Sequence, residues 1–243
     1  MGVLNHGGLF DSPDDAVARG LDLVAEGAGI LDVGDDLPQL SDVIAALAGH
    51  TRISINTTDP VVAEAAFTAG ATLVNDMSAS LWPIAADAGA GWIAVHGASG
   101  DATVREWLVE RATTALEGGV DEVWIDPGLG VGKSLSDTVA LLGRIDELVA
   151  TGIPVAVATS RKRFVGALLA ASDARAVEPA LPGLLAPPLV EVADDEVMTL
   201  SDDRIEGSLA TAMFALVHGV ALLRVHDVRA TVHAVRLLTA EAA

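Results

Sequence analysis

The chain has 243 residues, no cysteine and a formal net charge of −20 at pH 7. Its length fits one α/β barrel, and the lack of cysteine excludes a disulfide scaffold, a thiolate nucleophile and a cysteine-ligated metal. The negative charge would repel nucleic acid and anionic lipid, so we expect neither nucleic acid nor a membrane as a partner. With no apolar run long enough to cross a bilayer and no signal-like start, the sequence predicts a cytoplasmic protein.

Short apolar runs alternate with amphipathic segments along the whole chain. The runs, which we predict to be strands, are residues 3–5, 29–34, 52–56, 72–76, 92–96, 122–126, 154–160 and 220–227. Segments with helical spacing of alanine, leucine and valine include 14–27, 60–70, 102–119, 134–152, 202–219 and 228–242. Strict alternation indicates a parallel sheet, and eight repeats favour a closed (β/α)8 TIM barrel over an open doubly wound sheet.

One segment interrupts this alternation. Residues 174–201 are rich in proline and acidic side chains, and they precede the last predicted helix and strand. We expect an excursion from the barrel at this point, within a single domain that covers residues 1–243.

Polar residues end every predicted strand. In chain order they are Asn5 and His6, Asp32, Asn56 and Thr57, Asn75 and Asp76, His96, Asp126, Ser160 to Lys162, and Arg224 to Asp227. A single one, such as Asp76 or Asp227, is explained as well by helix capping. In α/β barrels, however, the active site lies at the carboxyl ends of the strands. Because so many polar residues converge on that face, we predict a binding site there.

Cationic residues gather after the last two strands. Arg161, Lys162 and Arg163 follow the seventh strand, and Arg224 and His226 end the eighth. The loops after strands seven and eight form a common phosphate site in this fold. The sequence therefore predicts a phosphorylated, anionic ligand.

The loop DPGLGVGKS at 126–134 is similar to a nucleotide-binding P-loop, but Pro127 stands where that motif requires its first glycine. We interpret the segment as a glycine-rich turn that brings Asp126 and Lys133 to the mouth of the barrel.

Eight strings of this sequence resemble, in order and spacing, those of the dihydropteroate synthase family. They are MGVLN (1–5), GILDVG (29–34), ISINT (53–57), VNDMSA (74–79), DPGLGVGK (126–133), TSRKRFVG (159–166), RIEGS (204–208) and RVHDV (224–228). The resemblance spans almost the whole chain, and its family fold agrees with the predicted barrel. It implies a cytoplasmic enzyme of folate biosynthesis that joins a hydroxymethyl-dihydropterin diphosphate to 4-aminobenzoate, releasing diphosphate.

The resemblance also implies the site residues. Asn56, Asn75, Asp126 and Lys162 would bind the pterin ring, whose alternating donors and acceptors suit a carboxylate facing a lysine. Asn5, Arg224 and His226 would hold the diphosphate together with Mg2+, with Asn5 as the metal ligand, and with Lys162 these three would form the catalytic set. The family commonly forms homodimers, for which the segments 202–219 and 228–242 are the expected contact.

The sequence departs from the family pattern in two loops and at one strand end. Residues 5–15 and 34–40 lack the family's usual NVTPDSFSDGG and GGESTRPG strings, although Phe10 and Asp11 are candidate substitutes, and Asn56 replaces an aspartate. Three hypotheses therefore remain at this point: a working synthase with variant loops, a pterin-binding homologue without synthase activity, and a pterin-dependent methyltransferase domain.

Overall fold

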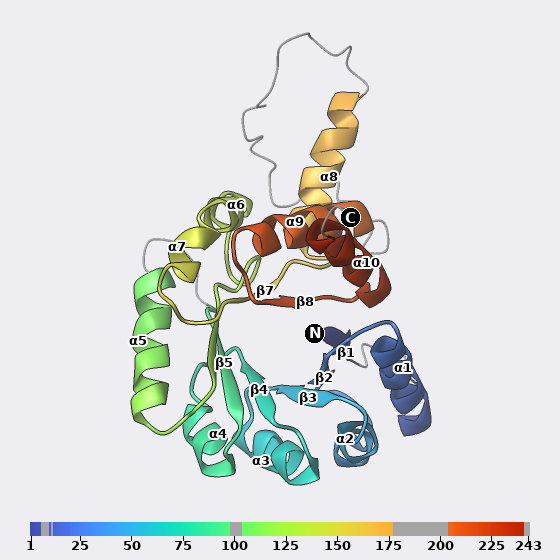
Figure 1. Ribbon diagram of the computed structural model, residues 1–243, viewed down its shortest axis with the longest axis vertical. Coiled ribbons are helices and arrows are strands. Elements are labelled where there is room, and N and C mark those ends of the chain that lie inside the picture. Colours follow the sequence, from blue (N-terminus) through green and yellow to red (C-terminus); the bar gives the residue numbers. More distant parts are fainter. Residues whose placement is uncertain (6–9, 11, 98–103, 177–203, 241–243) are drawn as a thin grey trace.

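The computed structural model describes residues 1–5, 10, 12–97, 104–176 and 204–240. Most of the predicted excursion at 174–201, together with His6 and Asp11, lies outside these described residues. Within them the predicted (β/α)8 barrel is confirmed (Figure 1).

The barrel wall consists of eight parallel strands close to the predicted runs. They are β1 (Gly2–Leu4), β2 (Ile30–Gly34), β3 (Arg52–Asn56), β4 (Leu73–Asp76), β5 (Gly91–Val95), β6 (Val123–Asp126), β7 (Ala156–Ala158) and β8 (Leu222–Arg224). Strands β1 to β6 pair in chain order, and β7 pairs with β8. Two short contacts join these sheets into a ring: the Val3 N–H donates to the Val225 carbonyl (3.0 Å), and the Ile125 N–H donates to the Pro154 carbonyl (3.0 Å).

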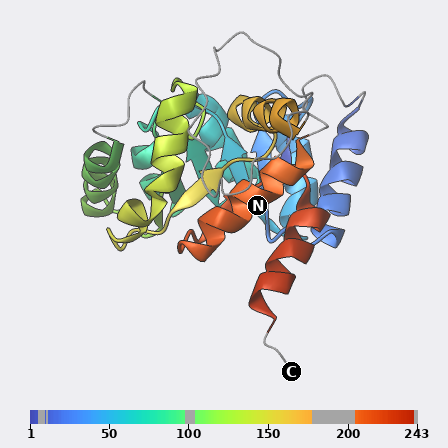
Figure 2. The ribbon, with the colours of Figure 1, turned by 90° about the horizontal axis from the view of Figure 1, so that it is seen from above.

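The helices cover the outside of this wall (Figure 2). They are α1 (Pro13–Ala25), α2 (Leu40–Ala48), α3 (Pro60–Ala69), α4 (Trp82–Ala88), α5 (Val104–Glu117), α6 (Leu135–Gly143), α7 (Ile145–Val149), α8 (Arg163–Ala176), α9 (Ile205–Val217) and α10 (Val228–Thr239). The prediction of a single helix over 134–152 was wrong, because Arg144 leaves the helical conformation (φ −118°, ψ 24°) and separates α6 from α7.

Local sequence explains where several helices begin. Ser12 caps α1 by accepting the Asp15 N–H, and Asp59 caps α3 by accepting the Val61 N–H. Proline follows each cap, where its fixed φ suits the first turn and its missing N–H costs nothing.

Side chains alternate between the barrel interior and the helix layer, as the two-residue period of a strand requires. Leu73, Ile93, Val95 and Ala156 form one buried cluster inside the barrel, against which Trp124 and Leu222 pack. Their strand neighbours, such as Val74, Ala94 and Ile125, belong instead to the large core between strands and helices. The parity of a strand residue therefore determines whether it faces the interior or the helices.

Asp76 is a polar strand-end residue whose side chain faces the helix layer. Its carboxylate accepts the Ser80 and Leu81 N–H groups (2.8 and 2.7 Å) and the Trp92 indole N–H (3.0 Å). Asp76 therefore fixes the start of α4 and lies outside the barrel interior.

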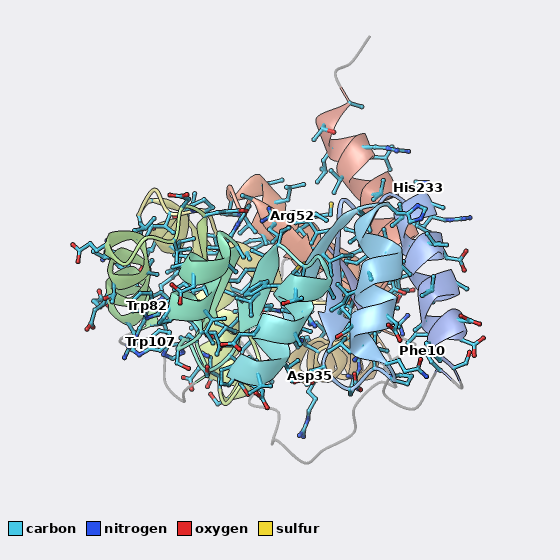
Figure 3. The ribbon with its side chains drawn as sticks, turned by 90° about the horizontal axis from the view of Figure 1, so that it is seen from below. Phe10, Asp35, Arg52, Trp82, Trp107 and His233 are labelled. Carbon is cyan, nitrogen blue, oxygen red and sulfur yellow. The ribbon has the colours of Figure 1, made fainter. Side chains whose placement is uncertain are left out.

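The two ends of the barrel differ in chemistry. At the amino ends of the strands, the Arg52 guanidinium pairs with the Glu122 carboxylate, with Nη1 and Oε1 2.7 Å apart. Figure 3 shows Arg52 toward one end of the barrel, and Phe10 and Asp35 toward the other.

None of the helices in the described ranges is long and apolar enough to cross a membrane.

Candidate active site

A buried carboxylate binds side chains from three other strands inside the barrel. Asp32, in the middle of β2, is 0% exposed. It accepts hydrogen bonds from the Ser54 hydroxyl on β3 (2.8 Å) and the Asn75 amide on β4 (3.3 Å), and it pairs with Arg224 Nε on β8 (2.6 Å). A buried charge without such partners would cost several kcal/mol, about the size of the whole stability of a small domain. Asp32 therefore requires Arg224 to lie inside the barrel.

Arg224 meets Asp32 through its Nε edge only. Its side chain is 16% exposed, and its terminal nitrogens bind no acceptor among the described residues. A guanidinium fixed along one edge presents its other donors in a set direction, which suits an anion with two oxygens.

Asn75 carries an unsatisfied polar atom. Its amide nitrogen is bound to Asp32, but its Oδ1 is buried and has no partner in the described part of the chain. Such an acceptor costs free energy unless a ligand supplies a donor. Asn75 therefore fits a ligand that presents an N–H group.

Asp126 ends β6 and lies buried beside cations. Its Oδ1 accepts the Gly128 N–H at 2.7 Å. Burial raises its pKa, and the Gly128 hydrogen bond and the charges of Lys162, Arg224 and Lys133 oppose this rise. For Lys162, burial lowers the pKa and the Asp126 charge opposes this. The Asp126 carboxylate and the Lys162 ammonium therefore interact electrostatically at the mouth.

The loop after β7 is held by its own arginine. Arg161 has a left-handed backbone (φ 59°), and its guanidinium binds both oxygens of Asp227, at 3.0 and 2.6 Å. Its N–H donates to the Ser208 hydroxyl (3.0 Å), and its carbonyl accepts from the buried Arg204 (2.9 Å). The predicted cations therefore have different roles: Arg161 supports the loop, and the loop presents Lys162.

His226 is neutral in the folded protein. Burial, followed by the charges of Arg224 and Arg161, lowers its pKa to about 4 from the ordinary 6.5. Its Nδ1 and its backbone N–H both lie 3.2 Å from the Ser160 hydroxyl oxygen. His226 can therefore offer a hydrogen bond to an anion, whereas Arg224 supplies the charge.

Asn5 and Asn56 line a hollow of about 320 Å3 beside the ends of β1 to β3. Gly34 lies between Asn5 and Asp36, since a Cβ at position 34 would be 3.0 Å from the Asn5 Cβ and 2.7 Å from an Asp36 oxygen. Asp35 also lines the hollow, and it accepts the Thr57 hydroxyl at 2.8 Å. This side of the mouth is acidic, in contrast to the β7–β8 side.

The described residues contain no group of three histidine, cysteine, aspartate or glutamate side chains that could hold a metal unaided. Mg2+ commonly keeps several waters and binds through one or two protein oxygens and substrate phosphates. The Asn5 amide oxygen, at the edge of the hollow with Asp35 and Asp36, fits such a partial site.

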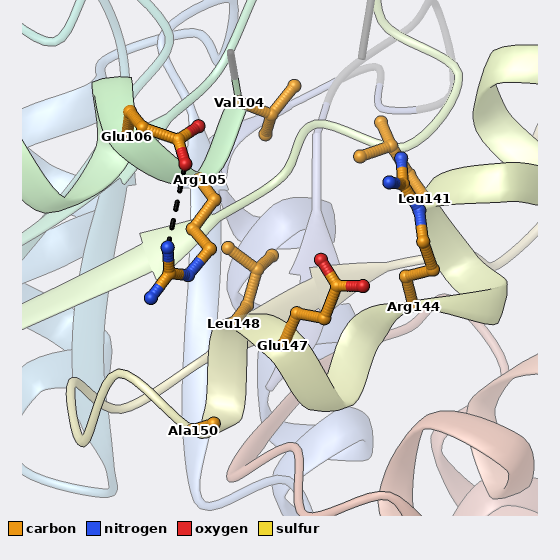
Figure 4. Close-up of a pocket in the computed structure, with 8 residues that line it drawn as sticks. All are labelled: Val104, Arg105, Glu106, Leu141, Arg144, Glu147, Leu148 and Ala150. Carbon is orange, nitrogen blue, oxygen red and sulfur yellow. Dashed lines mark hydrogen bonds and ion pairs between the residues drawn. The ribbon is translucent and has the colours of Figure 1, made fainter. Parts of the chain in front are cut away.

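A second hollow, of about 420 Å3, lies between α5 and the α6–α7 pair (Figure 4). Its walls carry Arg105 and Arg144 but also Glu106 and Glu147, and Arg105 pairs with Glu106 at 3.5 Å. Because it lies on the helical flank with mixed charge, we assign it no part in the chemistry of the mouth.

The structure brings most of the sequence-predicted residues to one place. Four of them, Asn56, Asn75, Asp126 and Arg224, are the interior-facing strand residues nearest the mouth. Asn5 and His226 continue the same parity one and two residues beyond β1 and β8, and Lys162 interacts electrostatically with Asp126. The sequence marked Asp32 only as one of the strand-end polar residues and gave it no role, and it missed Ser54. Both lie two residues before the last residue of their strands, so the strand period was the signal that could have found them.

Two further residues do not lie where the sequence suggested. His96 has the helix-facing parity, and its ring meets the Trp107 ring of α5 edge-on at 5.0 Å. Lys133 donates to backbone carbonyls rather than reaching a ligand position. Both were interpreted as mouth residues because sequence position alone does not give the direction of a side chain.

Comparisons with known proteins decide the family. The model described as "Pterin binding enzyme" matches residues 4–226. The chain belongs to the dihydropteroate synthase family. The Mycobacterium leprae dihydropteroate synthase is 35% identical, over 99% of this chain and 92% of that protein.

Solved structures of this synthase family have the same fold. The Thermus thermophilus enzyme superimposes with a TM-score of 0.79 at 36% identity, covering 98% of this chain and 92% of the other. The Xanthomonas albilineans synthase, solved in complex with 7,8-dihydropteroate, gives a TM-score of 0.79 at 32% identity, covering 98% and 91%. The protein is thus a transferase with the synthase barrel, as the resemblance implied.

Replacing Asp32 by asparagine should leave the Arg224 charge buried without its partner. We expect the free energy of unfolding to fall by about 3 to 5 kcal/mol. Ser54→Ala is the matched control, because it removes one neutral hydrogen bond to the same carboxylate and should cost about 1 kcal/mol. Urea unfolding of both variants measures the difference, and equal losses would contradict the importance of the ion pair.

The lowered pKa of His226 predicts a pH dependence of stability. Because the folded-state pKa of about 4 lies below the ordinary 6.5, the unfolded chain binds the proton first as the pH falls. The stability associated with neutral His226 is complete above pH 6.5 and is lost between pH 6.5 and 4. Urea unfolding across this window should show a smaller decline for His226→Gln than for the wild type. An NMR titration of His226 with a midpoint near 6.5 would contradict the assignment.

Proposed function

We propose that the protein condenses 6-hydroxymethyl-7,8-dihydropterin diphosphate with 4-aminobenzoate, giving 7,8-dihydropteroate and diphosphate. The observation that carries this proposal is the interior polar set around Asp32. It combines an unsatisfied buried acceptor on Asn75 with a carboxylate on Asp126 and a fixed guanidinium on Arg224. Family membership supports the reaction, and this set supports the assignment of separate places to a pterin ring and a diphosphate.

We assign the pterin ring to Asn75, Asp126, Lys162 and Asn56. The free Oδ1 of Asn75 accepts a ring or amino N–H, and the Asp126 carboxylate accepts a second. Lys162, beside Asp126, donates to the carbonyl side of the ring. Asn56 pairs in register with Asn75 and adds a mixed donor and acceptor next to it.

We assign the diphosphate to Asn5, Arg224 and His226. In the reaction, the amine nitrogen forms a bond to the methylene carbon, the carbon–oxygen bond to diphosphate breaks with its electron pair leaving on oxygen, and the amine loses a proton. The terminal nitrogens of Arg224 and an N–H of neutral His226 stabilise the departing oxygens. Mg2+, held by Asn5 and the phosphates, would neutralise further leaving-group charge when bound.

We further propose that two copies pair through α9 and α10, which contact each other. These helices expose Phe214 (38%), Val217 (64%), Leu237 (80%) and Leu238 (50%). Exposed apolar side chains gathered on neighbouring helices are typical of an interface. We also propose a cytoplasmic location, which the proposed substrate supports because a multiply charged diphosphate does not cross a bilayer unaided.

The decisive experiment is an assay of purified protein with Mg2+ and the pterin diphosphate. We expect release of diphosphate only when 4-aminobenzoate is added, and rescue of a synthase-deficient strain. Tight binding of the pterin diphosphate with no release would refute the synthase reaction and leave the pterin-binding alternative.

Arg224→Lys should separate the diphosphate contact from the pterin contact. The lysine keeps a cation beside Asp32 but lacks the terminal guanidinium nitrogens. We expect affinity for the diphosphate ester to fall about tenfold or more, since charge-assisted hydrogen bonds are lost, and affinity for the unphosphorylated pterin to stay constant. Calorimetric titration measures both ligands, with Arg229→Lys on the exposed face of α10 as control. Equal losses for both ligands would refute the assignment.

A further inference from the structure

Lys133, in the β6–α6 loop, uses its ammonium to join two loops. Its Nζ donates to the carbonyl oxygens of His96 (2.9 Å), Gly128 (3.1 Å) and Val131 (3.2 Å). The first acceptor follows β5, and the other two lie in the turn after β6. The three donors of one ammonium are thus matched by three backbone acceptors.

This arrangement explains why a lysine stands at position 133 in a chain that otherwise uses arginine. The sequence has two lysines, Lys133 and Lys162, among 14 basic residues. An ammonium is a compact group with three tetrahedral donors, whereas a guanidinium is a planar fork. Three carbonyls converging on a single point suit the ammonium alone.

The turn held by Lys133 is the one that contacts Asp126. Gly128 has a left-handed backbone (φ +64°), and its N–H donates to Asp126 Oδ1 at 2.7 Å. A Cβ on Gly128 would lie 2.0 Å from the His96 carbonyl oxygen and 3.3 Å from Lys133 Nζ. The Gly128 backbone is therefore pressed against the end of β5, and Lys133 spans this contact.

Electrostatics around Lys133 agree with this geometry. Burial lowers its pKa to about 8, and the charge of Asp126 opposes that shift, as does Asp137 on α6. The free-energy cost of burying an ammonium is offset where it donates to several acceptors, as Lys133 does here.

We propose that Lys133 is a positioning residue for pterin binding, which fixes the Gly128 turn between β5 and β6 and thereby orients the Asp126 carboxylate. The inference rests on the proposed role of Asp126 toward the pterin ring. It assigns to Lys133 no contact with either substrate.

The test compares Lys133→Met and Lys133→Gln with Ser134→Ala. Ser134 is the neighbouring residue and caps α6 by accepting the Asp137 N–H at 3.1 Å, so its loss weakens the same loop without touching the Gly128 turn. Calorimetry with 6-hydroxymethylpterin should show affinity about tenfold lower in both Lys133 variants and unchanged in Ser134→Ala. Affinity for inorganic diphosphate should stay constant throughout, because Arg224 and Asn5 do not depend on this turn. Equal losses for pterin and diphosphate would overturn the proposal.

Hydrogen exchange on the same proteins without ligand separates this inference from the proposed function. We expect faster exchange of the Gly128 and Val131 amides in the Lys133 variants, and faster exchange of the Asp137 and Thr138 amides in Ser134→Ala. Unchanged protection at Gly128 in both Lys133 variants would overturn the proposal even if the wild type binds pterin. If the wild type binds no pterin, the proposed function fails, and Lys133 then has no binding role to support, which overturns the inference too.

Discussion

The ion pair between Asp32 and Arg224 is the constraint on which the polar part of this barrel's interior depends. A fully buried carboxylate is tolerated only with compensating partners, and Asp32 has one charged partner and two neutral ones on three other strands. The bonds from these partners join β3, β4 and β8 to β2 at the Asp32 carboxylate. The same bonds leave the terminal nitrogens of Arg224 and the Oδ1 of Asn75 without partners among the described residues. The network that supports the fold therefore also presents groups for a ligand.

The barrel interior is divided by this network into two layers of different chemistry. Below it, Leu73 and Ala156, each the first residue of its strand, belong with Ile93 to an apolar cluster inside the barrel. Above it, polar side chains occupy the inward positions that end the strands. A ligand at the mouth thus meets a floor of fixed hydrogen-bonding groups that rests on a packed apolar layer.

Much of the fold could be predicted from the sequence, because alternation of apolar runs and amphipathic segments is a property of nearly every residue in the chain. The break at Arg144 could not, because arginine is a good helix former and the weak helix propensity of the neighbouring Gly143 does not by itself decide between one helix and two. At the site, strand-end polar residues identified the face but not their directions. Asp76 and His96 share strand ends with site residues and yet serve the helix layer, whereas Asp32 and Lys133 acquire their roles from partners far away in sequence.

The alternation along β4 places a ligand-facing residue and a fold-supporting residue side by side. Asn75 faces the interior, and the next residue, Asp76, fixes the start of α4 and binds the Trp92 indole. A one-residue insertion or deletion within this strand would exchange the two directions. Stability and substrate recognition would then be lost together, so a length change should be tolerated better in a loop between strand and helix than within β4.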